Sequence, residues 1–282
     1  MKLVRFGEKG AEKPGILDAD GAVRDASGEV DDYRPDTIGP ELMGRLRRLD
    51  PARLPRVETG VRLGPPIART GHFIAIGLNY EDHAREAGMP IPNEPIIFSK
   101  APSSLSGPDD DVILPPGSQK GDWELELGII IGRRAAYIDQ SEANNYIFGY
   151  CIANDVSERA LQLEGTGQWI KGKSCETFGP LGPWLVTPDE VPDPQDLDMW
   201  LEVSGERMQT GNTKTMIFPC AELGAYCSKV MVLEPGDVII TGTPPGVGLG
   251  RKPPRFLKPG ETMHLWIHGL GEQRQKVVRH PG

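Results

Sequence analysis

The sequence lacks a run of lysine or arginine residues long enough to form a basic patch. Its formal net charge is −9 at pH 7. Nucleic-acid binders usually carry a basic patch or stripe, so we expect no nucleic-acid partner. The short cluster of Arg45, Arg47 and Arg48 is interpreted as the solvated face of a helix.

Long apolar stretches are also missing. No segment of the sequence approaches the roughly 20 apolar residues that a membrane-spanning helix needs. Residues 1–6 already include Lys2 and Arg5, so they lack the apolar core of a secretion signal. We therefore expect no membrane partner and a cytoplasmic location.

Cysteine is scarce, with four residues in 282, and none of the four belongs to a CxxC pair. Cys220 and Cys227 are seven residues apart, which does not match the spacing of zinc ligands. In a chain without a secretion signal, Cys151, Cys175, Cys220 and Cys227 are expected to be reduced thiols. This usage argues against a disulfide framework and against a zinc site.

Glycine and proline, by contrast, are abundant, with 35 and 27 residues spread along the chain without a short repeat. Such a distribution is typical of many turns between short strands. With 38% hydrophobic residues the chain can bury a core. We predict an α+β fold that is mainly antiparallel β, closer to a roll or sandwich than to a doubly wound sheet.

The chain divides near residue 68. Residues 1–68 alternate short apolar segments with turns and predict a small N-terminal accessory domain rich in β-structure, while residues 69–282 carry the motifs of a catalytic domain. The pattern predicts strands at 2–6, 73–78, 95–100 and 123–131, an apolar run at 146–152, and helices at 40–49, 80–87, 157–163 and 220–230.

Acidic side chains are spaced for a metal site in the segment from Asp122 to Ile131. Alternate side chains of a strand point to the same face, so Glu124 and Glu126 lie together. Asp155 follows an apolar strand and supplies a third carboxylate. Oxygen ligands of this kind select a hard ion such as Mg²⁺, Mn²⁺ or Ca²⁺ over zinc. The alternative interpretation is that the two glutamates line the wet face of an amphipathic strand.

A second group of polar side chains lies on the helix predicted at 80–87. His83 and Glu86 are three residues apart, so a helix brings them into contact. A carboxylate that holds an imidazole raises its basicity, as a general base acting on water requires. The alternative is a solvated ion pair on a surface helix.

Two glycine-rich segments add candidate anion-binding groups. Lys173 lies in a flexible stretch and suits an anionic substrate, and the turn at 241–248 offers the Thr243 hydroxyl and backbone N–H groups as a possible carboxylate nest. The glycine spacing matches neither a Walker motif nor a dinucleotide fingerprint. Either segment can equally be turn chemistry.

Taken in order, these motifs resemble the fumarylacetoacetate hydrolase family from about residue 70 to the C-terminus. The matching stretches are GLNY (77–80) with His83 and Glu86, FSK (98–100), SGP (106–108), DWELE (122–126), NDVS (154–157) with Arg159 and Gln162, QW (168–169), GKS (172–174), Gln209, GNT (211–213), LEPGD (233–237) and TGTP (241–244). Each motif is weak alone, but their joint order is highly specific and favours the metal site and the base over the alternatives.

The resemblance implies a β-roll catalytic domain, usually dimeric, so a homodimer or a higher homo-oligomer is expected. It implies one Mg²⁺ or Mn²⁺ ion held by Glu124, Glu126 and Asp155, and a catalytic set of His83, Glu86 and Lys173, with the first two carried on a lid. It further implies that the substrate is bound by Tyr80, Lys100, Arg159, Gln162 and Thr243. Glu176 departs from the shorter aspartate that many members carry there.

The activity implied by the resemblance is hydrolysis of a 2,4-diketo acid, a small anionic substrate. His83 would deprotonate a water that attacks C4, and C3–C4 cleavage would expel pyruvate as its enolate, with Lys173 stabilising oxyanion charge. The chain looks most like members acting on 2,4-diketo-3-deoxy-L-rhamnonate or its L-fuconate counterpart. The alternatives are oxaloacetate decarboxylase, hydroxymuconate-type isomerase, ureidoglycolate lyase and, outside enzymes, a metal-stabilised binding module.

Overall fold

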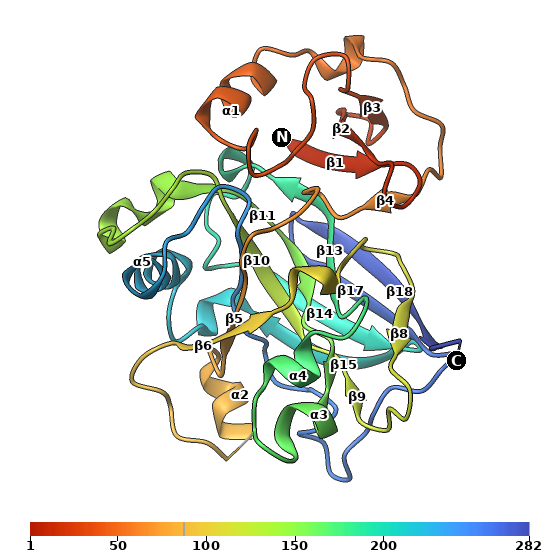
Figure 1. Cartoon of the computed structure of the whole chain (residues 1–282), viewed down its shortest axis with the longest axis vertical. Helices are drawn as coiled ribbons and strands as arrows, with labels where there is room; N and C mark the ends of the chain where they lie inside the picture. Colours follow the sequence, from red (N-terminus) through yellow and green to blue (C-terminus); the bar gives the residue numbers. More distant parts are fainter. Residues whose placement is uncertain (87, 282) are drawn as a thin grey trace.

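The protein folds mainly into β-strands joined by turns, with few and short helices, which confirms the predicted fold class (Figure 1). The computed structural model describes residues 1–86 and 88–281. Its helices are α1 (Pro40–Leu46), α2 (Glu81–Glu86), α3 (Arg159–Leu163), α4 (Ile170–Lys173) and α5 (Cys220–Val230). Within these described ranges no helix has the length and apolar character needed to cross a membrane.

The larger sheet runs through the middle of the molecule. Its strand order is β3 (Val23–Asp25), β2 (Lys13–Leu17), β1 (Lys2–Phe6), β13 (Gly179–Val186), β11 (Ile147–Asn154), β10 (Leu125–Ile131), β16 (Val238–Ile240), β5 (Phe73–Gly77) and β6 (Ile96–Lys100). Two short strands join beside this path, β4 (Leu63–Gly64) next to β1 and β7 (Leu105–Ser106) next to β13. Most neighbouring pairs are antiparallel, as predicted, while β16 with β5 and β13 with β7 are parallel.

A second sheet packs against this one and closes the core. It contains β15 (Glu206–Asn212), β14 (Asp198–Val203), β17 (Thr262–Ile267), β18 (Gly271–Arg279) and β8 (Val112–Leu114), while β9 (Gly121–Asp122) and β12 (Ser157–Glu158) form a separate pair. Alternation along β10 explains the packing, because Leu125, Leu127 and Ile129 share one cluster with residues of the second sheet such as Leu201. Both faces of β10 are buried, as its long apolar run requires.

The N-terminal segment continues the larger sheet. β1 pairs with β13 through Lys2↔Val186 and Leu3↔Leu185. Leu3, Leu46 and Ile130 belong to one buried cluster, so residues from both parts of the chain pack together. In Figure 1 this segment, with α1 and β1–β4, lies at one end of the molecule. The division at residue 68 remains a proposal, and Gly282, the last residue of the proposed catalytic domain, lies outside the described residues.

The four predicted helices agree with the structure except near their ends. The stretch around Lys173, predicted to be flexible, instead forms the short helix α4, and its Lys173 side chain is buried. α5 covers the predicted range, and α2 ends at Glu86, with Ala87 lying outside the described residues. The helix predicted at 157–163 begins at Arg159, two residues later than predicted. Ser157 and Glu158 pair with β9 as strand β12, and the Glu158 carboxylate then accepts a hydrogen bond from the N–H of Ala160 at the start of α3.

Candidate active site

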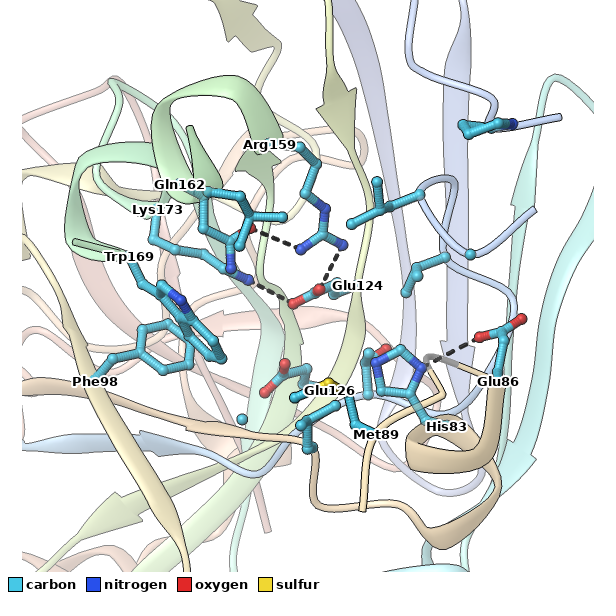
Figure 2. Close-up of a pocket in the computed structure, with 18 of the residues that line it drawn as sticks. His83, Glu86, Met89, Phe98, Glu124, Glu126, Arg159, Gln162, Trp169 and Lys173 are labelled. Carbon is cyan, nitrogen blue, oxygen red and sulfur yellow. Dashed lines mark hydrogen bonds and ion pairs between the residues drawn. The ribbon is translucent and has the colours of Figure 1, made fainter. Parts of the chain in front are cut away.

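A cavity of about 540 Å³ lies where α2, α3 and α4 meet the ends of β5 and β10. Its polar lining includes His83, Glu86, Glu124, Glu126, Arg159, Gln162, Lys173, Thr243, Arg251 and Lys252, and its apolar lining includes Ile76, Leu78, Met89, Phe98, Leu163, Trp169, Val247 and Leu249. Figure 2 shows Lys173, Trp169 and Phe98 on one side and His83 with Glu86 on the other, with Glu124 and Glu126 between them.

Three carboxylates meet at this cavity, and two of them, Glu124 and Glu126, belong to its lining. Glu124, Glu126 and Asp155 each offer an oxygen, and these oxygens lie within 4.8 Å of one another. Strand pairing produces this arrangement, because Leu125 of β10 lies opposite Asn154 of β11. Asp155 therefore emerges beside Glu124, and its N–H donates to the Glu124 carbonyl over 2.8 Å.

The carboxylates are buried and surrounded by cations. Lys173 Nζ lies 2.6 Å from both Glu124 Oε2 and Asp155 Oδ2. Lys100 Nζ donates to Asp155 Oδ1 over 2.5 Å, and Arg159 Nη2 donates to Glu124 Oε1 over 2.6 Å. Glu124 is 7% exposed and Asp155 is not exposed. The interpretation of a wet strand face therefore does not fit this segment.

Neighbouring charges shift the pKa values of Glu124 and Glu126 in opposite directions. Burial alone would raise the pKa of Glu124, but the positive charges of Arg159 and Lys173 outweigh it and lower this pKa to about 2. Burial raises the pKa of Glu126 well above its ordinary value, and the charges of Asp155 and Glu124 raise it further. The site thus combines one strongly ionised carboxylate with one that favours its proton.

The donor set fits a hard divalent cation. All three groups are carboxylates, and oxygen-only sites favour Mg²⁺, Mn²⁺ or Ca²⁺. The Lys173 ammonium already bridges Glu124 and Asp155, which shows that positive charge is stabilised at this point. Glu126 is further fixed by the N–H of Gly242, which donates to its Oε2 over 2.7 Å.

The His83–Glu86 contact exists as expected from the helical spacing. His83 Nδ1 lies 3.2 Å from Glu86 Oε2, and the imidazole is mostly buried. The N–H of Gly246 donates to both Glu86 oxygens over 3.1 Å, which ties α2 to the glycine turn. Burial alone would raise the pKa of Glu86, but the hydrogen bonds from His83 and Gly246 lower it overall.

Three of the predicted substrate-binding residues line the cavity. Arg159 and Gln162 stand on α3, with Arg159 Nη1 donating to Gln162 Oε1 over 2.9 Å. Thr243 lies in the glycine turn, where its hydroxyl donates to the Leu125 carbonyl over 2.9 Å. The prediction of a nest for a substrate carboxylate differs from the structure in one respect, because the N–H groups of Gly242 and Gly246 donate to carboxylates of the protein itself.

The other two are not among the described lining residues. The Tyr80 side chain is fully buried in the core, where its hydroxyl contacts Met199 Sδ over 3.3 Å. Lys100 is also fully buried and lies behind Asp155, whose carboxylate accepts a hydrogen bond from the Lys100 ammonium. Glu176 is exposed, so its departure from the family pattern does not alter the described cavity lining.

Trp169 and Phe98 form an aromatic wall of the cavity, for which the sequence predicted no role. Trp169 meets Phe98 edge-to-face with ring centroids 5.2 Å apart, and the Lys173 ammonium lies 5.2 Å from the Phe98 ring centroid. Gly77 makes room for the indole, because a Cβ at this position would stand 2.8 Å from Trp169 Cζ3. All three residues belong to motifs of the family pattern, which was the available signal.

Comparison with known proteins relates the chain to one family. Residues 72–278 match the family described as fumarylacetoacetate (FAA) hydrolase, C-terminal. A protein of Burkholderia ambifaria is 58% identical over 278 residues, covering 98% of this chain and 99% of the relative.

Two solved structures share the fold over the full chain. One is maleylpyruvate hydrolase from Sphingobium sp. SYK-6, solved with manganese(II) and pyruvate, with a TM-score of 0.81, 30% identity and 99% coverage of each chain. The other is 2-hydroxyhepta-2,4-diene-1,7-dioate isomerase from Mycobacterium marinum, with a TM-score of 0.75, 32% identity and 100% coverage of each chain. By sequence and by fold, this chain belongs to the fumarylacetoacetate hydrolase family.

Proposed function

We propose that this protein is a hydrolase dependent on Mg²⁺ or Mn²⁺ that cleaves the C3–C4 bond of a 2,4-diketo acid, giving pyruvate and a small acid. The observation that carries the proposal is that Glu124 and Glu126 line the same cavity as the His83–Glu86 pair. Asp155 completes the carboxylate cluster, with oxygens of the three residues within 4.8 Å of one another. The manganese and pyruvate bound in the maleylpyruvate hydrolase support the same chemistry for this fold.

Glu124, Glu126 and Asp155 would hold the cation. When bound, a divalent cation acts as a Lewis acid that polarises a carbonyl and stabilises enolate charge. Lys100 is best placed to orient Asp155 from behind, so we propose a supporting role for it in place of direct substrate contact. Tyr80, whose hydroxyl lies in the core, is left out of the proposed substrate contacts.

The remaining side chains divide the work of hydrolysis. His83, oriented by Glu86, takes a proton from the water that attacks C4. The C3–C4 electron pair then leaves with C3 as the pyruvate enolate, which is protonated to pyruvate, while C4 becomes the carboxyl of the second product. Lys173 stabilises oxyanion charge, and Arg159, Gln162 and Thr243 contact the anionic substrate.

The candidate reactions differ in whether a water molecule attacks the substrate. Decarboxylation of oxaloacetate and isomerisation of a hydroxymuconate-type diacid both proceed through an enolate without an attacking water. The contact between His83 and Glu86 favours a reaction in which water is activated. We therefore place hydrolysis first and the isomerase second, the latter because a solved structure of this fold is an isomerase. The decarboxylase and ureidoglycolate lyase readings rank below these.

A substrate panel tests the proposal. The protein is incubated with Mn²⁺ and acetylpyruvate, 2,4-diketo-3-deoxy-L-rhamnonate, its L-fuconate counterpart, oxaloacetate or 2-hydroxyhepta-2,4-diene-1,7-dioate. Pyruvate, carbon dioxide and any isomer of the dienoate are measured. We expect pyruvate without carbon dioxide from at least one diketo acid, with the sugar-acid derivatives fastest. His83→Ala should retain Mn²⁺ affinity and lose about 10²- to 10⁴-fold in kcat. Isomerisation of the dienoate without any C–C cleavage would contradict the proposal.

Assembly is a separate proposal. We propose that the chain forms a homodimer or a higher homo-oligomer. Light scattering coupled to gel filtration measures the mass directly, and a mass equal to one chain at micromolar concentration would contradict it.

A further inference from the structure

Asp122 is a buried carboxylate that stands two residues before Glu124. It lies in β9 and has no exposed surface. Its Oδ1 accepts hydrogen bonds from the N–H groups of Trp123 (2.8 Å) and Gly248 (2.7 Å). Its Oδ2 accepts from the N–H of Leu249 (3.0 Å) and from Arg159 Nε (2.8 Å). Three backbone groups therefore anchor the carboxylate, and its fourth partner is a side chain of the cavity.

Arg159 links Asp122 to the carboxylate site, because it donates hydrogen bonds to both Asp122 and Glu124. Its guanidinium is planar and uses a different nitrogen for each partner. Nε donates to Asp122, Nη1 donates to Gln162 and Nη2 donates to Glu124 Oε1 over 2.6 Å. Strand pairing supports the link from the backbone, because Ser157 of β12 lies opposite Asp122, two residues before Arg159. A path of hydrogen bonds thus runs from Asp122 through Arg159 to Glu124.

We propose that Asp122 is a positioning residue that sets the cation affinity of the site through Arg159. Its negative charge balances the guanidinium, and its anchored oxygens hold Arg159 where Nη2 orients Glu124. Without that charge, Arg159 would lose one of its two carboxylate partners, and more of its positive charge would be left to repel a cation held at Glu124. This inference rests on the proposed function, because it takes the carboxylate triad as a metal site.

Asparagine is the substitution that isolates this charge. It keeps the size of the side chain but replaces one acceptor oxygen by an NH₂ donor. In either position that donor faces two other donors: the N–H groups of Trp123 and Gly248 in place of Oδ1, or the N–H of Leu249 and Arg159 Nε in place of Oδ2. Changing a group that supports a metal ligand typically costs 10- to 100-fold in metal affinity or activity. We expect a loss of that size for Asp122→Asn.

Asp237 supplies a matched control. It is 1% exposed, and its two oxygens accept from the N–H groups of His72 (2.7 Å) and Glu234 (2.8 Å). It lies at the far end of β10, where its carbonyl accepts from the N–H of Ile131. Asp237→Asn therefore removes a buried, backbone-anchored carboxylate without touching the cavity.

The experiment is calorimetric titration of Mn²⁺ into the metal-free protein, with urea unfolding as a check on stability. Asp122→Asn should weaken Mn²⁺ binding by about 10- to 100-fold, while Asp237→Asn should change it less than about twofold even if it is equally destabilised. Equal Mn²⁺ affinities for Asp122→Asn and the wild type would overturn the inference. An equal loss in both variants would overturn it as well, because a general effect of lost stability would then suffice.

A second comparison holds even where Asp122→Asn does not fold. Arg159→Met and the double variant Asp122→Asn/Arg159→Met both lack the guanidinium, and removing both charges together is tolerated better than stranding one. If Asp122 acts through Arg159, the Mn²⁺ affinities of these two variants should agree within about twofold, since the coupling is gone. A further tenfold loss in the double variant would show that Asp122 acts by another route and would overturn the inference.

The two proposals fail in different ways. If the wild type binds Mn²⁺ and Asp122→Asn weakens that binding, yet no diketo acid releases pyruvate, the proposed reaction falls and the role of Asp122 stands. If diketo acids are cleaved and Asp122→Asn binds Mn²⁺ like the wild type, the role of Asp122 falls alone.

Discussion

Replacing Glu86 by glutamine tests whether the His83–Glu86 pair acts as a general base. Glutamine keeps the shape of the side chain and an oxygen that accepts from Gly246, so α2 should stay attached to the glycine turn. What disappears is the negative charge beside His83 Nδ1, 3.2 Å away. Because Glu86 does not contact Glu124, Glu126 or Asp155, Mn²⁺ affinity and KM should remain close to those of the wild type.

The expected loss can be worked from the contact. A hydrogen bond to a charged group contributes about 1.5–3 kcal/mol, and about 1.4 kcal/mol corresponds to a tenfold change in rate. The Glu86 side chain is 25% exposed, so solvent screening places its effect in the lower part of that range. We predict that kcat falls about 10- to 30-fold.

The assay is pyruvate release from the fastest diketo acid at saturating Mn²⁺. Glu81→Gln is the matched control, since Glu81 lies on the same helix and pairs with Arg85 on its exposed side; this variant should keep kcat within about twofold, as surface pairs contribute little. A folded Glu86→Gln protein with the kcat of the wild type would refute the base assignment.

Two further predictions concern the cavity wall and the N-terminal segment. Gly77→Ala should push the Trp169 indole from its place, because the new Cβ would stand 2.8 Å from Cζ3. KM should then rise several-fold and the tryptophan emission should shift. An unchanged KM would exclude Trp169 and Phe98 from substrate binding. Burial alone would raise the pKa values of Glu12 and Asp110, but hydrogen bonds from Arg62 lower both from ordinary values of 4.5 and 3.8. Their stabilising contribution is thus present above those values and lost on acidification, so the unfolding free energy of Arg62→Gln should vary less between about pH 5 and pH 3 than that of the wild type.

Local pattern was enough to predict which side chains of the candidate site lie close together. Alternation along residues 123–131 predicted that Glu124 and Glu126 lie together, and their carboxylates do lie close, although β10 begins only at Leu125. The helical spacing predicted the contact between His83 and Glu86. These features depend on the periods of strand and helix, which act over a few residues. The position of Asp155 next to Glu124 adds only one antiparallel pairing between β10 and β11.

Features that depend on long-range packing could not be predicted in the same way. Lys100 and Tyr80 share motifs with site residues, yet the Lys100 side chain lies behind Asp155 and the Tyr80 side chain lies in the core. The order of strands in the sheet decides which side chains of β6, and of the residues just before α2, face the cavity. The pairing of β1 with β13 joins residues more than 180 apart in sequence. Asp122 drew no attention alone, since its role comes from three segments meeting around it.

The central claim is that a cation held by Glu124, Glu126 and Asp155 carries the reaction. The most direct measurement titrates Mn²⁺ into protein freed of metal by a chelator and follows bound Mn²⁺ and pyruvate release from a diketo acid in the same samples, for the wild type and for Glu124→Gln. We predict that release rises in step with bound Mn²⁺ up to one ion per chain, and that Glu124→Gln loses both together. Full pyruvate release by the metal-free protein, or by a Glu124→Gln variant that binds no Mn²⁺, would contradict the account.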